Sequence, residues 1–140
     1  MKTEIIFFDN YENSMQGTYR GLIAFISLIV LDFIYFNFTK DLYYLGNNIS
    51  KTDVNIYSAL LSWLLLASAI SVQLPKNFNE SILYGALVGL VVYGIFNLVN
   101  YSMLKQWSIS IVLMDTLWGV FNCSFAAGLI YLLYWNNKQK

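Results

Sequence analysis

The chain has 140 residues, of which 58% are hydrophobic and only 11% are charged. A soluble domain of this size has a large surface for its volume and carries roughly 25% charged residues, so the composition excludes a soluble globular protein. The formal net charge of zero argues against a nucleic-acid binder. The absence of histidine and the single cysteine exclude zinc sites, histidine acid–base catalysis and disulfides.

Four apolar stretches follow a polar beginning. We expect residues 1–20 to form a loosely ordered N-terminal tail. Each apolar stretch is close to or above the length of about 18–20 residues that a helix needs to cross a bilayer. They predict an all-α integral membrane protein, a bundle of four transmembrane helices. The domain covers residues 21–135, with spans at 21–38, 54–74, 81–99 and 108–134 and a basic tail at 136–140.

The first span contains a charged residue, Asp32, whose insertion cost must be weighed against its apolar neighbours. A central aspartate costs about 2.5–3.5 kcal/mol on insertion. The twelve Leu, Ile, Phe and Val residues of 21–38 together contribute about −5 kcal/mol as an upper value. The apolar contribution is larger, so we expect this span to insert.

The short connecting segments carry most of the remaining charge and set the predicted orientation. By the positive-inside rule, the side with more Lys and Arg faces the cytoplasm. Five such residues lie on the side of both termini and three on the other, which places both termini at the cytoplasmic face. The five are Lys2, Arg20, Lys76, Lys138 and Lys140, and the three are Lys40, Lys51 and Lys105.

Two carboxylates lie inside predicted spans, Asp32 in the first and Asp115 in the fourth, and no Lys or Arg lies deep in any span. An unpaired carboxylate is expensive in hydrocarbon, so each must be protonated, hydrogen-bonded, hydrated or paired with a mobile cation. Asp32 lies six residues before Phe38, about 9 Å from the outer end at 1.5 Å per residue. Asp115 lies at a similar depth, so the two acids are expected in one layer.

Helical spacing aligns further polar residues with these acids. In the fourth span Asp115, Trp118, Gly119 and Asn122 follow one another at i, i+3, i+4 and i+7, which is one face of a helix. We expect Gly85, Gly89 and Gly119 to serve helix packing. The predicted polar intramembrane cluster consists of Asp32, Ser58, Ser62, Tyr93, Asn97, Asn100, Asp115, Trp118 and Asn122.

Three interpretations of this cluster stay open. The groups can join the helices by hydrogen bonds of about 0.6 kcal/mol each, in a non-enzymatic membrane component such as a virion or envelope structural protein, the interpretation we favour. They can instead hold a proton, a cation or a solute in a small transporter or channel subunit. An intramembrane enzyme is disfavoured, because Asp115 lies in a Leu-Met-Asp-Thr context without a catalytic motif. We therefore assign no catalytic residue, no metal and no cofactor.

The third and fourth spans read GALVGLVVYGIFNLVNYSMLKQWSISIVLMDTLWG. This segment resembles the signature of an uncharacterised family of membrane proteins, number 2177 among domains of unknown function, which has bacterial and large-DNA-virus members. The signature has a GAL-x-GL run, a Leu-basic-x-Trp turn and an Asp-x-x-Trp-Gly end. Leu31 to Phe36 resemble its first span. The resemblance covers residues 22–134 and implies a four-helix membrane protein without an assigned activity.

The resemblance also marks individual positions and two departures. Asn97 stands where the family usually has Asp, which removes one ionisable group, and Tyr35 stands where Trp is usual. The matching positions are Asp32, Gly85, Gly89, Tyr93, Asn100, Trp107, Asp115, Trp118 and Gly119.

The composition and the predicted spans also indicate the kind of organism, the location and the partners of the protein. Lysine outnumbers arginine seven to one, a bias typical of AT-rich genomes, which fits a large DNA virus or an AT-rich microbe. The predicted location is a viral envelope or inner membrane, or a cellular membrane. The predicted partners are the lipid bilayer and either further copies of the chain or other membrane or virion proteins, and not nucleic acid.

Overall fold

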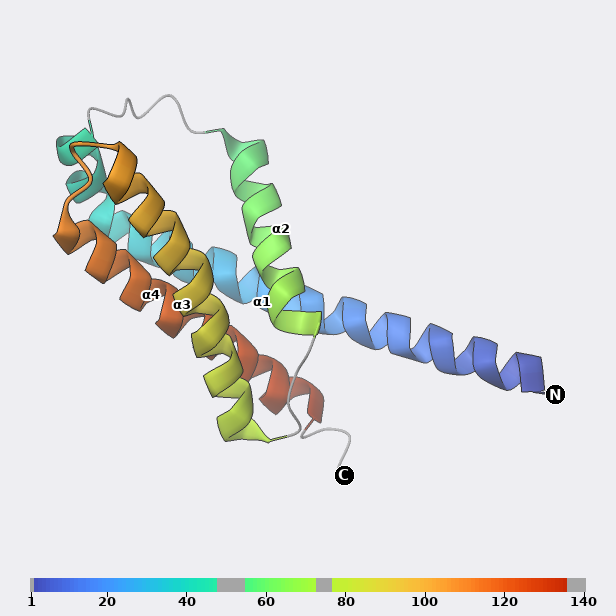
Figure 1. Cartoon of the computed structure of the whole chain (residues 1–140). Coiled ribbons are helices and arrows are strands. Elements are labelled where there is room, and N and C mark those ends of the chain that lie inside the picture. Colours follow the sequence, from blue (N-terminus) through green and yellow to red (C-terminus); the bar gives the residue numbers. More distant parts are fainter. Residues whose placement is uncertain (1, 48–54, 73–76, 136–140) are drawn as a thin grey trace.

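The structure is a computed structural model that describes residues 2–47, 55–72 and 77–135, with side chains over 15–41, 55–72 and 77–134. Within these ranges every regular element is helical, which confirms the all-α prediction (Figure 1). The elements are α1 (Lys2–Asn47), α2 (Ile56–Val72), α3 (Phe78–Met103), α4 (Ile109–Ile130) and a π-helical turn η1 (Tyr131–Trp135) that continues α4.

Helix α1 begins much earlier than the predicted first span. It runs from Lys2, so the segment that we expected to be a loosely ordered tail is helical from its second residue. No proline interrupts residues 2–47, and once a helix is nucleated each further residue adds a backbone hydrogen bond. Helix α1 therefore continues without a break from its apolar part into a more polar N-terminal part.

Three helical segments are long and apolar enough to cross a membrane, namely Met15–Asp41, Phe78–Met103 and Ile109–Tyr134. Helix α2 is apolar but has 17 residues, which gives about 25 Å at 1.5 Å per residue. That length is at the lower limit for a span. Residues 73 and 74, which end the predicted second span, lie outside the described residues. A membrane crossing by α2 therefore stays a prediction.

Polar residues begin three of the helices. The side chain of Asn55 accepts hydrogen bonds from the backbone of Tyr57 and Ser58 at the start of α2. Asn77 does the same for α3 and Ser108 for α4. Such residues satisfy backbone N–H groups that have no partner in the first turn of a helix. In the segment that joins α3 to α4, the Trp107 backbone N–H donates to the Leu104 carbonyl at 3.0 Å, directly before Ser108 begins α4.

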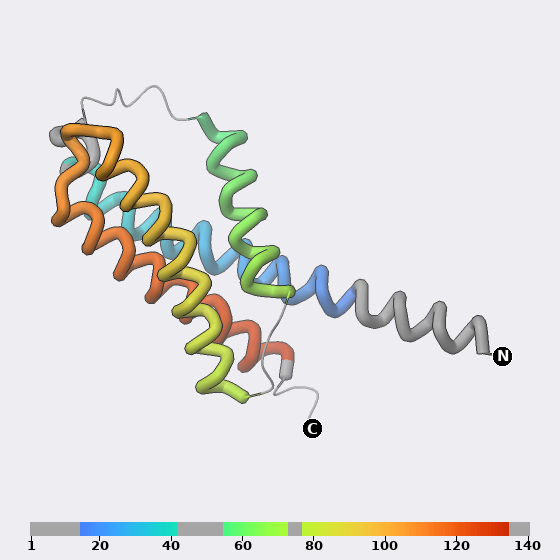
Figure 2. The backbone as a smooth tube through the Cα atoms, in the orientation of Figure 1, coloured from blue at the N-terminus to red at the C-terminus, as the bar shows by residue number. Residues whose placement is uncertain are grey.

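Helices α3 and α4 run side by side and make the most extensive helix–helix contact of the described residues (Figure 2). A side chain on Gly85 would collide with the Cys123 carbonyl, and one on Gly89 with the Gly119 carbonyl. Gly119 in turn lies against the ring of Tyr93. The three glycines that the sequence suggested for packing therefore all lie at the α3–α4 contact, where they allow the backbones to approach closely.

The other two helices pack around this pair. Helix α1 contacts both α2 and α4, whereas α2 touches α3 and α4 only slightly. The buried core between α1, α2 and α4 is built from mostly small or medium side chains, namely Ala24, Leu28, Leu66, Ala67, Ile70, Cys123, Ala126, Ala127, Ile130 and Tyr134.

Large apolar side chains cover the outside of the bundle. Phe38 is 83% exposed, Met103 76% and Leu117 68%. In water such a surface would aggregate, but in a bilayer these side chains contact lipid tails that are as apolar as they are. The exposure pattern therefore agrees with a helical bundle that lies in a membrane.

Replacing Gly89 with Ala is expected to lower stability by about 1–3 kcal/mol, the usual cost of inserting a methyl group into a packed contact. The new Cβ would also meet the Cα of Val120 at 2.9 Å. Helix unfolding of the purified protein in detergent, followed by circular dichroism, measures the change. Gly94→Ala on the same helix is the matched control, because its Cβ would meet only a Thr116 methyl group at 3.8 Å. Equal stabilities of the two variants would contradict the close α3–α4 contact.

Candidate functional site: an acidic, aromatic cavity between the helices

Asp32 on α1 accepts three hydrogen bonds from side chains of two other helices. Trp63 Nε1 of α2 donates to Oδ2 at 2.8 Å. From α4, Trp118 Nε1 and Asn122 Nδ2 both donate to Oδ1, at 2.8 Å and 2.7 Å. Hydrogen bonds to an ionised acceptor are stronger than those between neutral groups. They stabilise a carboxylate away from water and join α1 to both neighbouring helices.

Asp115 on α4 is the second acid, and it is 8% exposed. It accepts a hydrogen bond from Asn97 Nδ2 of α3 at 2.7 Å. The same amide group donates to the Tyr93 carbonyl at 2.9 Å, and its oxygen accepts from Trp107 Nε1 at 3.1 Å. Asn97 thus connects Asp115 to the segment between α3 and α4.

Both acids line one cavity of about 590 Å³ between the helices. Among the described residues that form its wall, Asp32 and Asp115 are the only charged ones. Aromatic side chains from all four helices and from the α3–α4 connection make up most of the rest, namely Phe33, Tyr35, Phe36, Trp63, Tyr93, Phe96, Trp107 and Trp118.

Two ring pairs extend the hydrogen-bonded groups into this wall. Tyr35 stacks on Trp118 with a centroid distance of 4.4 Å and an angle of 5° between the planes. Phe96 meets Trp107 edge to face at 6.0 Å and 83°. Such geometries add about 0.5–1.5 kcal/mol to simple apolar burial. Each acid is therefore linked, directly or through Asn97, to an indole that forms part of the cavity wall.

The structure brings most of the predicted cluster together. Asp32, Trp118 and Asn122 form one hydrogen-bonded group, and Asn97 and Asp115 form the other. Tyr93 lies in the wall of the same cavity. These side chains therefore lie together between the helices, and their common depth in a membrane stays a prediction.

Three predicted residues lie differently. Ser58 is exposed at the start of α2. Asn100 donates its amide to the Phe96 carbonyl of its own helix. Ser62 reaches the cavity wall, yet its hydroxyl donates to the Ala59 carbonyl at 2.8 Å. Short polar side chains commonly bond to their own helix in this way, and so need no polar neighbour across the bundle.

Helix α2 contributes Trp63 instead, which the sequence analysis did not include. Tryptophan in membrane proteins is enriched at the interfaces, but Trp63 lies in the middle of the predicted span 54–74. A buried indole N–H usually finds an acceptor. The position of Trp63 inside the span was therefore a signal that could have indicated its bond to Asp32. The buried face of α2 is accordingly formed by Leu66, Ala67, Ile70 and Ser71, and not by Ser58 and Ser62 of the predicted cluster.

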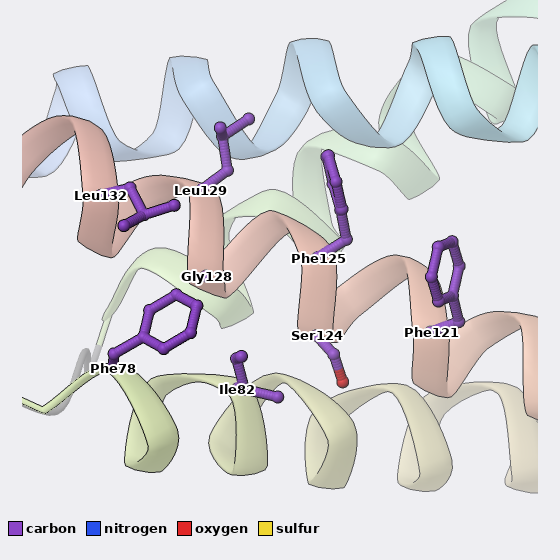
Figure 3. Close-up of a pocket in the computed structure, with 8 residues that line it drawn as sticks. All are labelled: Phe78, Ile82, Phe121, Ser124, Phe125, Gly128, Leu129 and Leu132. Atoms are coloured by element: carbon purple, nitrogen blue, oxygen red, sulfur yellow. The ribbon is translucent and has the colours of Figure 1, made fainter.

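A second cavity, of about 360 Å³, has a wholly different lining (Figure 3). It lies along α3 and α4, and none of the described residues in its wall is titratable. Its one polar side chain, Ser124, donates its hydroxyl to the Val120 carbonyl at 2.7 Å. The rest of the wall consists of Phe78, Ile82, Phe121, Phe125, Gly128, Leu129 and Leu132. It offers apolar contact only, so of these two cavities the first is the one with titratable side chains in its wall.

Two buried side-chain oxygens, Asn122 Oδ1 and Oγ1 of Thr116, which follows Asp115 in the sequence, have no hydrogen-bond partner in the part of the chain that the structure describes. Asn122 is fully buried, and while its Nδ2 donates to Asp32, its Oδ1 is unpartnered. Within the same part of the chain, no group of three His, Cys, Asp or Glu side chains is placed to hold a metal ion. The site is therefore a pair of acids that accept hydrogen bonds from neutral donors, next to the unpartnered amide oxygen of Asn122.

Fold and site together define a multi-pass helical membrane protein with a polar cluster inside the bundle. The chain belongs to the family described as predicted membrane protein (DUF2177), whose family model matches residues 18–132. This confirms the resemblance seen in the sequence. No curated protein and no solved structure matches the chain.

Replacing Trp63 with Phe is expected to lower the stability of the bundle by about 1–2 kcal/mol, because it keeps a ring but removes one donor to a charged acceptor. Unfolding in detergent, followed by circular dichroism, measures the loss. Tyr57→Phe on the same helix is the control, since it removes a hydroxyl from a side chain that is 81% exposed. If the two variants were equally stable, the Trp63–Asp32 bond would not hold α2 in place.

Proposed function

We propose that the chain is a subunit of a small membrane transporter or channel, and that the cavity between its helices binds a cation. The observation that supports this most directly is that Asp32 and Asp115, which come from different helices, line one cavity. No Lys or Arg is present among the described residues of its wall.

The balance of charge supports the proposal. The indole and amide groups that bond to the acids are neutral, so they stabilise the carboxylates without cancelling their charge. Intramembrane acids commonly mark ion or substrate pathways. In a medium of low dielectric constant, two negative charges attract a cation far more strongly than they do in water.

The position of the cavity in the bundle and the length of the chain add two further parts to the proposal. The cavity is formed by the C-terminal halves of α1 and α3 with the N-terminal halves of α2 and α4. With both termini at the cytoplasmic face, as we propose, it lies nearer the outer face. A chain of 140 residues is small for a complete pathway, so the proposal includes association of several copies.

A structural role in a membrane or a virion envelope is the second candidate. One observation favours it, namely that the described bonds of each acid join different helices. In this role the acids would fix how the helices pack, and the work of the protein would be done at its surfaces. The two candidates differ in whether the charge of the acids matters once the bundle has formed.

Flux measurements separate these candidates. In proteoliposomes, we expect cation- or proton-dependent flux that Asp32→Asn and Asp115→Asn each abolish, because the amide keeps the shape of the side chain and removes its charge. Asp41→Asn, at an exposed position near the end of α1, is the matched control and should retain flux. Circular dichroism and size-exclusion chromatography show whether each variant is folded. Undiminished flux in a folded double variant would contradict the proposed function.

A further inference from the structure

The size of the acidic cavity indicates what kind of cation it fits. About 590 Å³ lies within the range of about 300–1,000 Å³ that is usual for sites of small organic molecules. A dehydrated divalent cation needs about six or more oxygen ligands at close range. The described wall offers two carboxylates, and no cluster of three acidic or sulfur ligands is found in the described part of the chain.

The chemistry of the wall points the same way. Tyr35 and Trp118 form a stacked pair there, and Phe96 and Trp107 form an edge-to-face pair. Aromatic faces attract cations, with an interaction of about 2 kcal/mol or more when water is excluded. Apolar substituents on the same cation would be buried against these rings, which favours binding further.

The hydrogen bonds of Asp32 restrict the cation more closely. An ionised carboxylate has about four acceptor positions, and three of those of Asp32 already receive N–H groups from Trp63, Trp118 and Asn122. A primary ammonium, with its three N–H groups, would compete for these positions. A quaternary ammonium has no N–H group and needs only negative charge and ring faces nearby. Donation to an anion also polarises the indoles and makes their faces more negative.

We infer that the ligand of this cavity is an organic ammonium ion with apolar substituents, held by the charges of Asp32 and Asp115 and by the faces of the surrounding rings. The inference rests on the proposed function, because it names the class of cation that the proposed site binds.

The test uses the full chain in phosphatidylcholine nanodiscs and radiolabelled phenyltrimethylammonium as the probe, with empty nanodiscs as the blank. The competitors are the unlabelled probe, tert-butylbenzene, NaCl, KCl and MgCl₂. Tert-butylbenzene has the same shape as the probe but carries no charge. We expect saturable binding that the unlabelled probe displaces, with at least tenfold weaker competition by the neutral isostere and by each salt at matched ionic strength.

Two variants of Tyr35 in the cavity wall distinguish the contribution of its ring to binding from that of its hydroxyl. Tyr35→Leu should weaken binding of the probe at least tenfold, whereas Tyr35→Phe, which keeps the ring, should lose much less affinity than Tyr35→Leu. Phe38→Leu is the matched control on the same helix, because Phe38 is 83% exposed and lies outside the cavity wall. Equal affinities of Tyr35→Leu and Phe38→Leu would contradict a role for the rings.

The outcomes also distinguish this inference from the proposed function. If the probe fails to bind but inorganic cation or proton flux persists and depends on Asp32 and Asp115, the organic ammonium is wrong and the transport function stands. If tert-butylbenzene displaces the probe as well as the unlabelled probe does, the cavity selects for shape alone and the inference is overturned. If neither probe binding nor flux depends on the acids, both proposals fail.

Discussion

A carboxylate inside a bilayer needs hydrogen-bond donors, and the way Asp32 obtains them governs the arrangement of the helices. Its described donors come from α2 and α4, so α1 is bound to both. Helix α2 has little contact with α3 and α4, and its polar links are few. Trp63 reaches Asp32, and the Tyr84 hydroxyl of α3 donates to the Ala69 carbonyl at 2.7 Å. The position of α2 therefore depends on its apolar packing against α1 together with the Trp63–Asp32 bond.

Asn97 connects the second acid to two other groups through a single amide side chain. As an amide it donates to Asp115 and to the Tyr93 carbonyl, and it accepts from Trp107. An aspartate at this position would put two carboxylates in contact, and such pairs must share a proton because like charges disfavour joint ionisation. In this chain the amide avoids that conflict, because it donates to Asp115 and still offers Trp107 an acceptor.

The sequence predicted the parts of this site that depend on one helix at a time. Span length gives the depth of Asp32 and Asp115, and helical spacing puts Trp118 and Asn122 on the face of Asp115, because both follow from fixed rise and rotation per residue. The rotation of α2 about its axis was not predictable in this way, since it depends on packing against other helices. Trp63 was therefore missed, and Ser58 was assigned to the wrong face. The early start of α1 was missed for a different reason. Hydropathy locates the segment of a helix that lies in the bilayer, and it does not show where the helix itself begins or ends.

The hydrogen bonds that join the helices to the two acids come from neutral donors. A salt bridge to Lys or Arg would have held Asp32 equally well, but it would have brought a positive charge into the cavity and occupied the space. Indole and amide donors orient the carboxyl groups and add no charge of their own. They also contribute the rings that form the wall, as Trp63, Trp107 and Trp118 show. A structural role for these hydrogen bonds is therefore no argument against a binding role, because the same donors supply both the packing and the environment that a cation would enter.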